Sequence, residues 1–114
     1  MVPSLVLEVE NQVAEFTPDT EGEDAQRPSM TLGKDPANDF VCANPFTSRR
    51  HARIEFQHND FFLVDHSTNG SYVQTEDEQV THVHRSRLRL WGDGWISLGS
   101  PLHVGTPIHF RQGD

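Results

Sequence analysis

The chain has 114 residues, of which 34% are hydrophobic, and a length of this order suits one compact domain with a single core. Its formal net charge is −8. Residues 1–26 contain seven acidic residues and no lysine or arginine, and residues 27–114 contain nine basic and ten acidic residues, a net charge of −1. The single cysteine, Cys42, excludes an internal disulfide or a multi-cysteine zinc site. No long apolar run or signal peptide is present, so we expect a cytoplasmic protein without a membrane segment.

Short runs of alternating apolar and polar residues recur along the chain, and no sustained helical period is present, so the pattern predicts an all-β protein. The first two runs, residues 5–10 and 13–16, read as a hairpin. Residues 17–28 contain two prolines, one glycine and four acidic side chains, which predicts an exposed acidic loop. A short strand through Met30 and Leu32 follows and leads into Gly33.

The later runs extend the same pattern to roughly ten strands, which favours a β-sandwich. Phe61 to Val64 is apolar on both faces and is predicted as a central strand, with a turn at Asn59-Asp60 before it. Arg85, Arg87 and Arg89 are expected to share the solvent face of one strand. The remaining predicted strands lie at residues 40–42, 52–57, 72–73, 88–90, 96–98 and 108–110.

Three loops combine cations, hydroxyl groups and glycines, which is the donor set that a phosphorylated side chain needs. They are Gly33-Lys34-Asp35, Thr47-Ser48-Arg49-Arg50-His51 and Ser67-Thr68-Asn69-Gly70-Ser71. The basic side chains Lys34, Arg49, Arg50 and Arg53 either form one focused basic patch or are scattered over the solvated surface.

These loops, together with Asn38-Asp39-Phe40-Val41, Phe62-Leu63-Val64-Asp65 and Ile96-Ser97-Leu98-Gly99, resemble the forkhead-associated (FHA) domain in order and spacing. The resemblance runs from about Met30 to Phe110 within a single domain of residues 1–114. It implies an eleven-strand β-sandwich with ligand loops at one end, which bind phosphothreonine peptides. It also implies a pocket for the threonine methyl group.

Carried over by position, the family pattern places Ser48 and Arg49 on the phosphate, with Lys34 and Thr68 contributing from the neighbouring loops. Asn69 is expected to hold the peptide backbone. A second set has structural roles: His51 fixes the Ser48 loop, and Gly33 and Gly70 permit tight turns.

Two residues depart from the family pattern. Lys34 stands where an arginine is usual, and Ser71 stands where a threonine is usual. Lysine keeps the charge but loses the planar two-pronged donor, so the resemblance implies working but weakened phosphate recognition.

The same sequence offers residues for two other functions. Ser48 and His51 could form a nucleophile and base, but no nucleophile elbow is present and no acidic residue can be assigned to orient the histidine, so we expect no enzyme. His82 and His84 could form a metal site, but no third ligand stands at a recognisable spacing, so we expect no metal and no cofactor.

The predicted partner is therefore a phosphothreonine-containing protein in a signalling pathway, and neither nucleic acid nor a membrane. In the family, such modules usually regulate an effector such as a kinase or a cyclase, in the same chain or in a partner. The alternative is a phospho-independent interaction or assembly scaffold whose phosphate pocket has weakened, and Lys34 is the residue that favours it.

Overall fold

The computed structural model describes residues 3–18 and 29–113, which form eleven strands and no helix. Alternating side chains with one buried face are the pattern that a strand in a two-layered sheet requires. The strands are β1 (Ser4–Val9), β2 (Gln12–Phe16), β3 (Ser29–Gly33), β4 (Phe40–Val41), β5 (Ala52–Gln57), β6 (Asp60–Asp65), β7 (Ser71–Gln74), β8 (Val80–Val83), β9 (Arg87–Leu90), β10 (Gly94–Leu98) and β11 (Ile108–Gly113).

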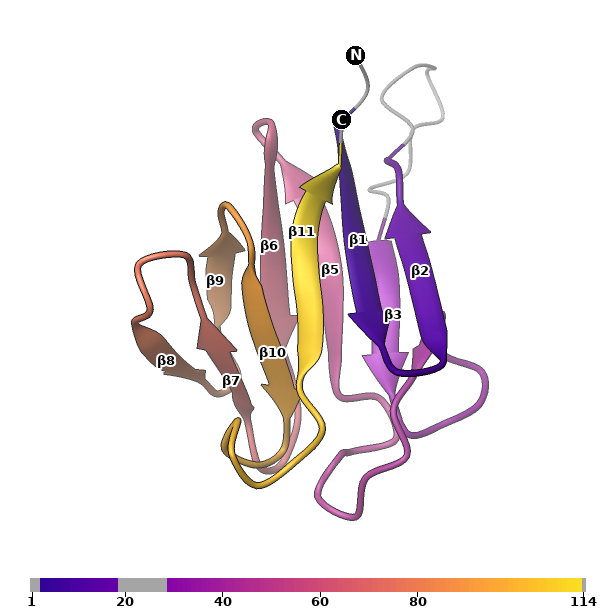
Figure 1. The fold of residues 1–114 in the computed structure, drawn as a ribbon. Helices are drawn as coiled ribbons and strands as arrows, with labels where there is room; N and C mark the ends of the chain where they lie inside the picture. The colour runs from indigo at the N-terminus through magenta and orange to yellow at the C-terminus, as the bar shows by residue number, and fades with distance from the viewer. Residues whose placement is uncertain (1–2, 19–28, 114) are drawn as a thin grey trace.

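The strands form two sheets that face each other (Figure 1). The six-stranded sheet has the order β2-β1-β11-β10-β7-β8, and the five-stranded sheet has the order β4-β3-β5-β6-β9. All pairings are antiparallel except that of β3 with the two-residue strand β4. The predicted all-β sandwich with eleven strands is confirmed.

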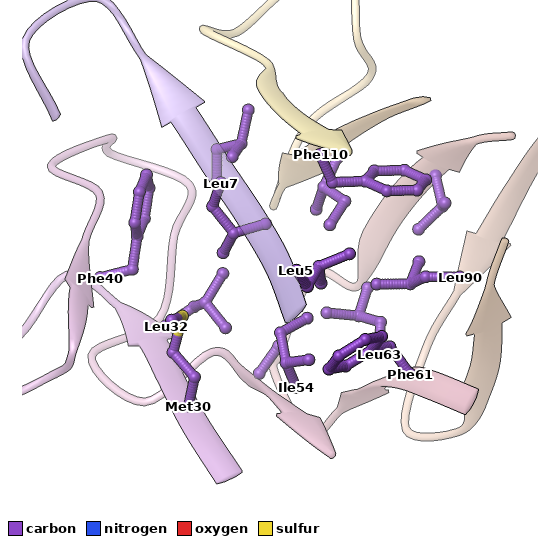
Figure 2. Close-up of a cluster of buried hydrophobic side chains, with 14 of the residues drawn as sticks. Leu5, Leu7, Met30, Leu32, Phe40, Ile54, Phe61, Leu63, Leu90 and Phe110 are labelled. Atoms are coloured by element: carbon purple, nitrogen blue, oxygen red, sulfur yellow. The ribbon is translucent and has the colours of Figure 1, made fainter. Parts of the chain in front are cut away.

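The core lies between the two sheets and is built from the inward-facing residue of each alternating pair. Leu5 and Leu7 of β1 are fully buried, as are Ile54 of β5 and Leu63 of β6. Figure 2 shows these side chains together within one continuous cluster that both sheets contribute to. Because this cluster removes apolar surface of both sheets from water, it holds the two layers together.

Six connections lie at one end of the sandwich, at the bottom of Figure 1. They are residues 10–11, 34–39, 42–51, 66–70, 84–86 and 99–107. The register explains the convergence, because the end of β3 pairs with the start of β5 through Leu32 and Ala52, and Ala52 pairs in turn with Asp65 at the end of β6. The three loops singled out in the sequence are therefore neighbours at this end.

Several local predictions were wrong. The pattern missed β8, because three of its four residues are exposed and give no apolar alternation. The turn before β6 is centred on His58 and Asn59, both of which have positive φ, and Asp60 already belongs to the strand. β6 pairs on both sides, as predicted, but its outward residues are only half-buried.

Arg85 also departs from the prediction that it shares a strand face with Arg87 and Arg89. It lies in the turn before β9 with a φ of 51°, and its backbone N–H donates to Asp65 Oδ1 over 3.0 Å. The predicted acidic loop of residues 17–28 lies outside the described residues except for Thr17 and Pro18. In the described ranges, no helix is long and apolar enough to cross a membrane.

Candidate functional site

Ser48 joins three of the loops at the end of the sandwich. Its carbonyl oxygen accepts the backbone N–H of Lys34 at 3.0 Å, which ties it to the β3–β4 loop. Its Oγ accepts the backbone N–H of Thr68 at 3.3 Å, which ties it to the β6–β7 loop. Because the hydroxyl oxygen acts as an acceptor here, its own hydrogen remains available for an incoming acceptor.

Arg49 follows Ser48 and is held by its backbone. The carbonyl oxygen of Arg49 accepts the side-chain amide of Asn38 at 2.6 Å and the backbone N–H of Asp35 at 3.1 Å. Its side chain is exposed, as is that of Lys34. Neither guanidinium nor ammonium forms an ion pair with another described residue, so both charges face solvent at the same end of the molecule.

Thr68 and Asn69 approach Ser48 from the β6–β7 loop, and both are exposed. The side-chain amide of Asn69 donates to the carbonyl oxygen of Phe46 over 3.0 Å, which links this loop to the β4–β5 loop. The bond uses one of the two amide hydrogens, so the second hydrogen and the Oδ1 atom remain for another partner.

His51 is completely buried beneath these loops. Its Nδ1 accepts the backbone N–H of Ser48 at 3.0 Å, and its Nε2 lies 2.8 Å from the carbonyl oxygen of Gly70. Because a carbonyl oxygen can only accept, Nε2 carries the hydrogen and the ring is neutral. Burial lowers the pKa of His51, although the bond to Gly70 and the nearby Asp65 carboxylate oppose this shift.

The geometry of His51 contradicts the reading of Ser48 and His51 as a nucleophile and its base. Both ring nitrogens are engaged with backbone groups, one as an acceptor and one as a donor. Neither nitrogen is therefore available to remove the proton from the Ser48 hydroxyl group.

Asp65 is a buried carboxylate that the sequence reasoning did not single out. It accepts hydrogen bonds from the hydroxyl groups of Ser67 and Ser71, at 2.9 and 2.6 Å, and from the backbone N–H groups of Ser67 and Arg85. Burial alone would raise the pKa of Asp65, but these hydrogen bonds outweigh it and lower the pKa below its usual value. An aspartate two residues before a serine at a strand end is a turn signal that could have revealed it.

This network also accounts for Ser71, one of the two departures from the family pattern. The hydroxyl group that a threonine would share with serine is the group that bonds to Asp65. Ser71 thus supplies the buried hydrogen bond, and only a methyl group distinguishes it from threonine.

Two glycines allow the loops to approach closely. A Cβ atom at Gly33 would lie 2.2 Å from the carbonyl oxygen of Arg49, and one at Gly70 would lie 2.3 Å from Nε2 of His82. Gly70 also has a φ of +83°, a conformation that favours glycine.

The rings of His82 and His84 stack with their centroids 5.9 Å apart. In the part of the chain that the structure describes, no three histidine, cysteine, aspartate or glutamate side chains converge.

Comparison with known proteins decides the family. A sequence profile of the FHA domain matches residues 30–91, which is more than half of the chain. The chain belongs to the FHA domain family. All the loops that carry Lys34, Ser48 and Asn69 fall within the matched residues of this FHA domain.

Solved structures agree with this assignment. The structure resembles the first FHA domain of Mycobacterium tuberculosis Rv1747, with a TM-score of 0.76 and 21% identity over 100% of both chains. It also resembles the N-terminal FHA domain of Saccharomyces cerevisiae Rad53p, solved in complex with a phosphothreonine peptide, with a TM-score of 0.67 and 19% identity over 98% of this chain and 92% of that one. At these identities the likeness shows the fold.

One curated relative matches a shorter segment. An oxoglutarate dehydrogenase inhibitor from Corynebacterium diphtheriae is 41% identical over 51 residues, which is 44% of this chain and 36% of that protein. The match therefore spans little more than a third of the relative.

Proposed function

We propose that the chain, residues 1–114, is a single module that recognises phosphothreonine in a partner protein and mediates a phosphorylation-dependent interaction. The observation that carries the proposal is the position of Ser48, whose backbone and hydroxyl group bond to both neighbouring loops. Around it stand two cations, Lys34 and Arg49, that have no ion-pair partner among the described residues. An anion with several acceptor oxygens fits such a site.

The proposed role of each residue follows from the hydrogen-bonding atoms or charge that the fold leaves unpaired. The Ser48 hydroxyl hydrogen and the Arg49 guanidinium bind the phosphate, and Lys34 adds a point charge. Thr68 contributes a further hydrogen bond, and the free amide hydrogen and oxygen of Asn69 bind the peptide backbone. Gly33, His51 and Gly70 position these groups and do not touch the ligand. Two or three charge-assisted bonds, less the cost of association, correspond to a Kd of about 1 μM.

The proposed activity is binding without chemistry. His51 is not free to act as a base toward Ser48, because both of its ring nitrogens are bonded to the backbone of Ser48 and Gly70. The solved Rad53p domain was captured with a phosphothreonine peptide, which supports a similar ligand here. We propose that the partner is a cytoplasmic signalling protein, and that the module recruits or regulates an effector such as a kinase or a cyclase.

The test is calorimetric titration with three matched degenerate peptide pools that carry phosphothreonine, phosphoserine or unmodified threonine. We expect heat from the phosphothreonine pool alone, and loss of that heat in Arg49→Ala. Arg89→Ala is the control, because Arg89 is equally cationic but lies on β9, where its guanidinium lies 4.0 Å from the Asp60 carboxylate. A folded protein that gives no heat with any pool, beside a positive-control FHA domain that does, would instead support the phospho-independent scaffold.

A further inference from the structure

A cavity lined by two arginines lies beside the proposed phosphate site. It has a volume of about 330 Å³ and is bounded by the β3–β4 loop and the start of β5. The residues that matter among its walls are Thr31, Asp35, Asn38, Arg50, Arg53 and His66. Arg50 and Arg53 belong to the basic set that the sequence indicated, and the proposed function uses neither of them.

One positive charge in this cavity, that of Arg50, has no ion-pair partner among the described residues. Arg50 is exposed, and its guanidinium has no hydrogen bond or ion pair to another described residue. Arg53 bonds through Nε to Glu55 at 2.8 Å, which leaves its terminal nitrogens free. The one acidic wall residue, Asp35, accepts the backbone N–H of Ala37. Because Arg53 is paired with Glu55, Arg50 is the arginine of this cavity that has no ion-pair partner among the described residues.

The cavity and the phosphate site share a wall. The side-chain amide of Asn38, which lines the cavity, donates to the carbonyl oxygen of Arg49 over 2.6 Å. Arg49 and Arg50 are consecutive, so their Cα atoms are about 3.8 Å apart. An extended peptide advances about 3.3 Å per residue, so residues close in sequence to a phosphothreonine bound at Arg49 come within reach of Arg50.

We propose that this cavity binds a second anionic side chain of the same peptide, either a carboxylate or a second phosphate, with Arg50 as its main cation. The inference rests on the proposed binding of phosphothreonine at Ser48 and Arg49. Arginine suits this role because its planar fork pairs with both carboxylate and phosphate groups. The volume admits one such side chain and is too small for a folded partner surface.

The test uses a peptide with one fixed phosphothreonine in an alanine background. One glutamate, or one additional phosphothreonine, is placed at each position from four before to four after the fixed residue. Affinities are measured by fluorescence anisotropy for the wild-type protein, Arg50→Gln and Arg89→Gln. The last variant removes the same charge from an exposed position on the same sheet, and thermal unfolding checks that each variant is folded.

We expect at least one position at which the second anion tightens wild-type binding by about fivefold or more. Arg50→Gln should abolish that gain while it changes the affinity of the singly phosphorylated peptide by less than about twofold, and Arg89→Gln should retain the gain. A gain from the additional phosphothreonine alone identifies a phosphate subsite, and a gain from glutamate as well identifies a general anion subsite.

The proposal is overturned if no position gives a gain, if the gain survives in Arg50→Gln, or if Arg89→Gln loses it too. If Arg50→Gln weakens binding of the singly phosphorylated peptide as much as binding of the peptide with a second anion, Arg50 belongs to the phosphothreonine site. That result would also overturn the proposal. Failure of every peptide to bind is a different result, because it rejects the proposed phosphothreonine function itself.

Discussion

The backbone N–H of Ser48 donates to Nδ1 of the buried His51 over 3.0 Å. A side chain three residues further along the chain thereby fixes the backbone that presents the Ser48 hydroxyl group. This arrangement requires a neutral imidazole, because a proton on Nδ1 would face the donor hydrogen of Ser48. The position of the Ser48 hydroxyl group thus depends on His51, which is buried and does not reach the surface of the site.

We expect His51→Ala to lower the free energy of unfolding by about 2–4 kcal/mol, because it removes one buried and one partly buried hydrogen bond and leaves a cavity. Urea denaturation measures the change, and phosphopeptide affinity should fall as the Ser48 loop loses its support. His103→Ala is the control, since His103 is exposed and should change stability by less than about 0.5 kcal/mol. An equally small effect of His51→Ala would contradict the positioning role.

We expect the domain to lose stability as the pH falls, in two steps. The pKa of His51 is lowered from 6.5 by burial, so below about pH 6.5 the unfolded chain takes up a proton that the folded chain refuses. The pKa of Asp65 is lowered from 3.8 because its hydrogen bonds outweigh burial, so a further loss begins as the pH approaches 3.8.

Urea denaturation at half-unit steps from pH 8 to pH 2 measures both steps. The first step should shrink in a folded His51→Ala variant, whereas His103→Ala should retain it. A free energy of unfolding that stays constant or rises between pH 6.5 and 5 would be incompatible with a neutral buried His51.

We expect Lys34→Arg to tighten phosphothreonine binding by about threefold to tenfold, because arginine adds a planar two-pronged contact where lysine offers a point charge. Lys34→Ala should weaken binding. Calorimetry with one phosphothreonine peptide measures both changes, and Arg111→Lys serves as a distant control on β11. If Lys34→Arg leaves the Kd unchanged, this position does not limit affinity.

We expect Gly33→Ala to disturb both stability and binding. Its Cβ would lie 2.2 Å from the carbonyl oxygen of Arg49 and 2.8 Å from the Asn38 amide nitrogen, so the Ser48-Arg49 backbone must move. The cost should be about 1–3 kcal/mol of unfolding free energy. Binding is measured at a temperature where the variant is fully folded, and unchanged affinity there would show that the close contact does not position Arg49.

The strand Ala52–Gln57 was predictable because its apolar residues alternate with polar ones in the sequence, although Glu55 is buried and Phe56 only half-buried in the structure. β8 was not, because a strand at the sheet edge with exposed residues carries no such period. The turn before β6 was placed one residue too far along the chain. The sequence pattern does not show that His58 and Asn59 adopt positive φ while Asp60 does not.

The amino-acid sequence by itself determined the all-β class, the order of the motif-bearing loops and the residue types that can hold a phosphate, because these depend on neighbours in the chain. Only the tertiary structure decided that Ser48 bonds to Lys34 and Thr68, that Asp65 anchors the β6–β7 loop, and that Arg50 faces a separate cavity. These relationships join residues from different strands and loops, and they form only when the two sheets pack around a common core and fix the register of their ends.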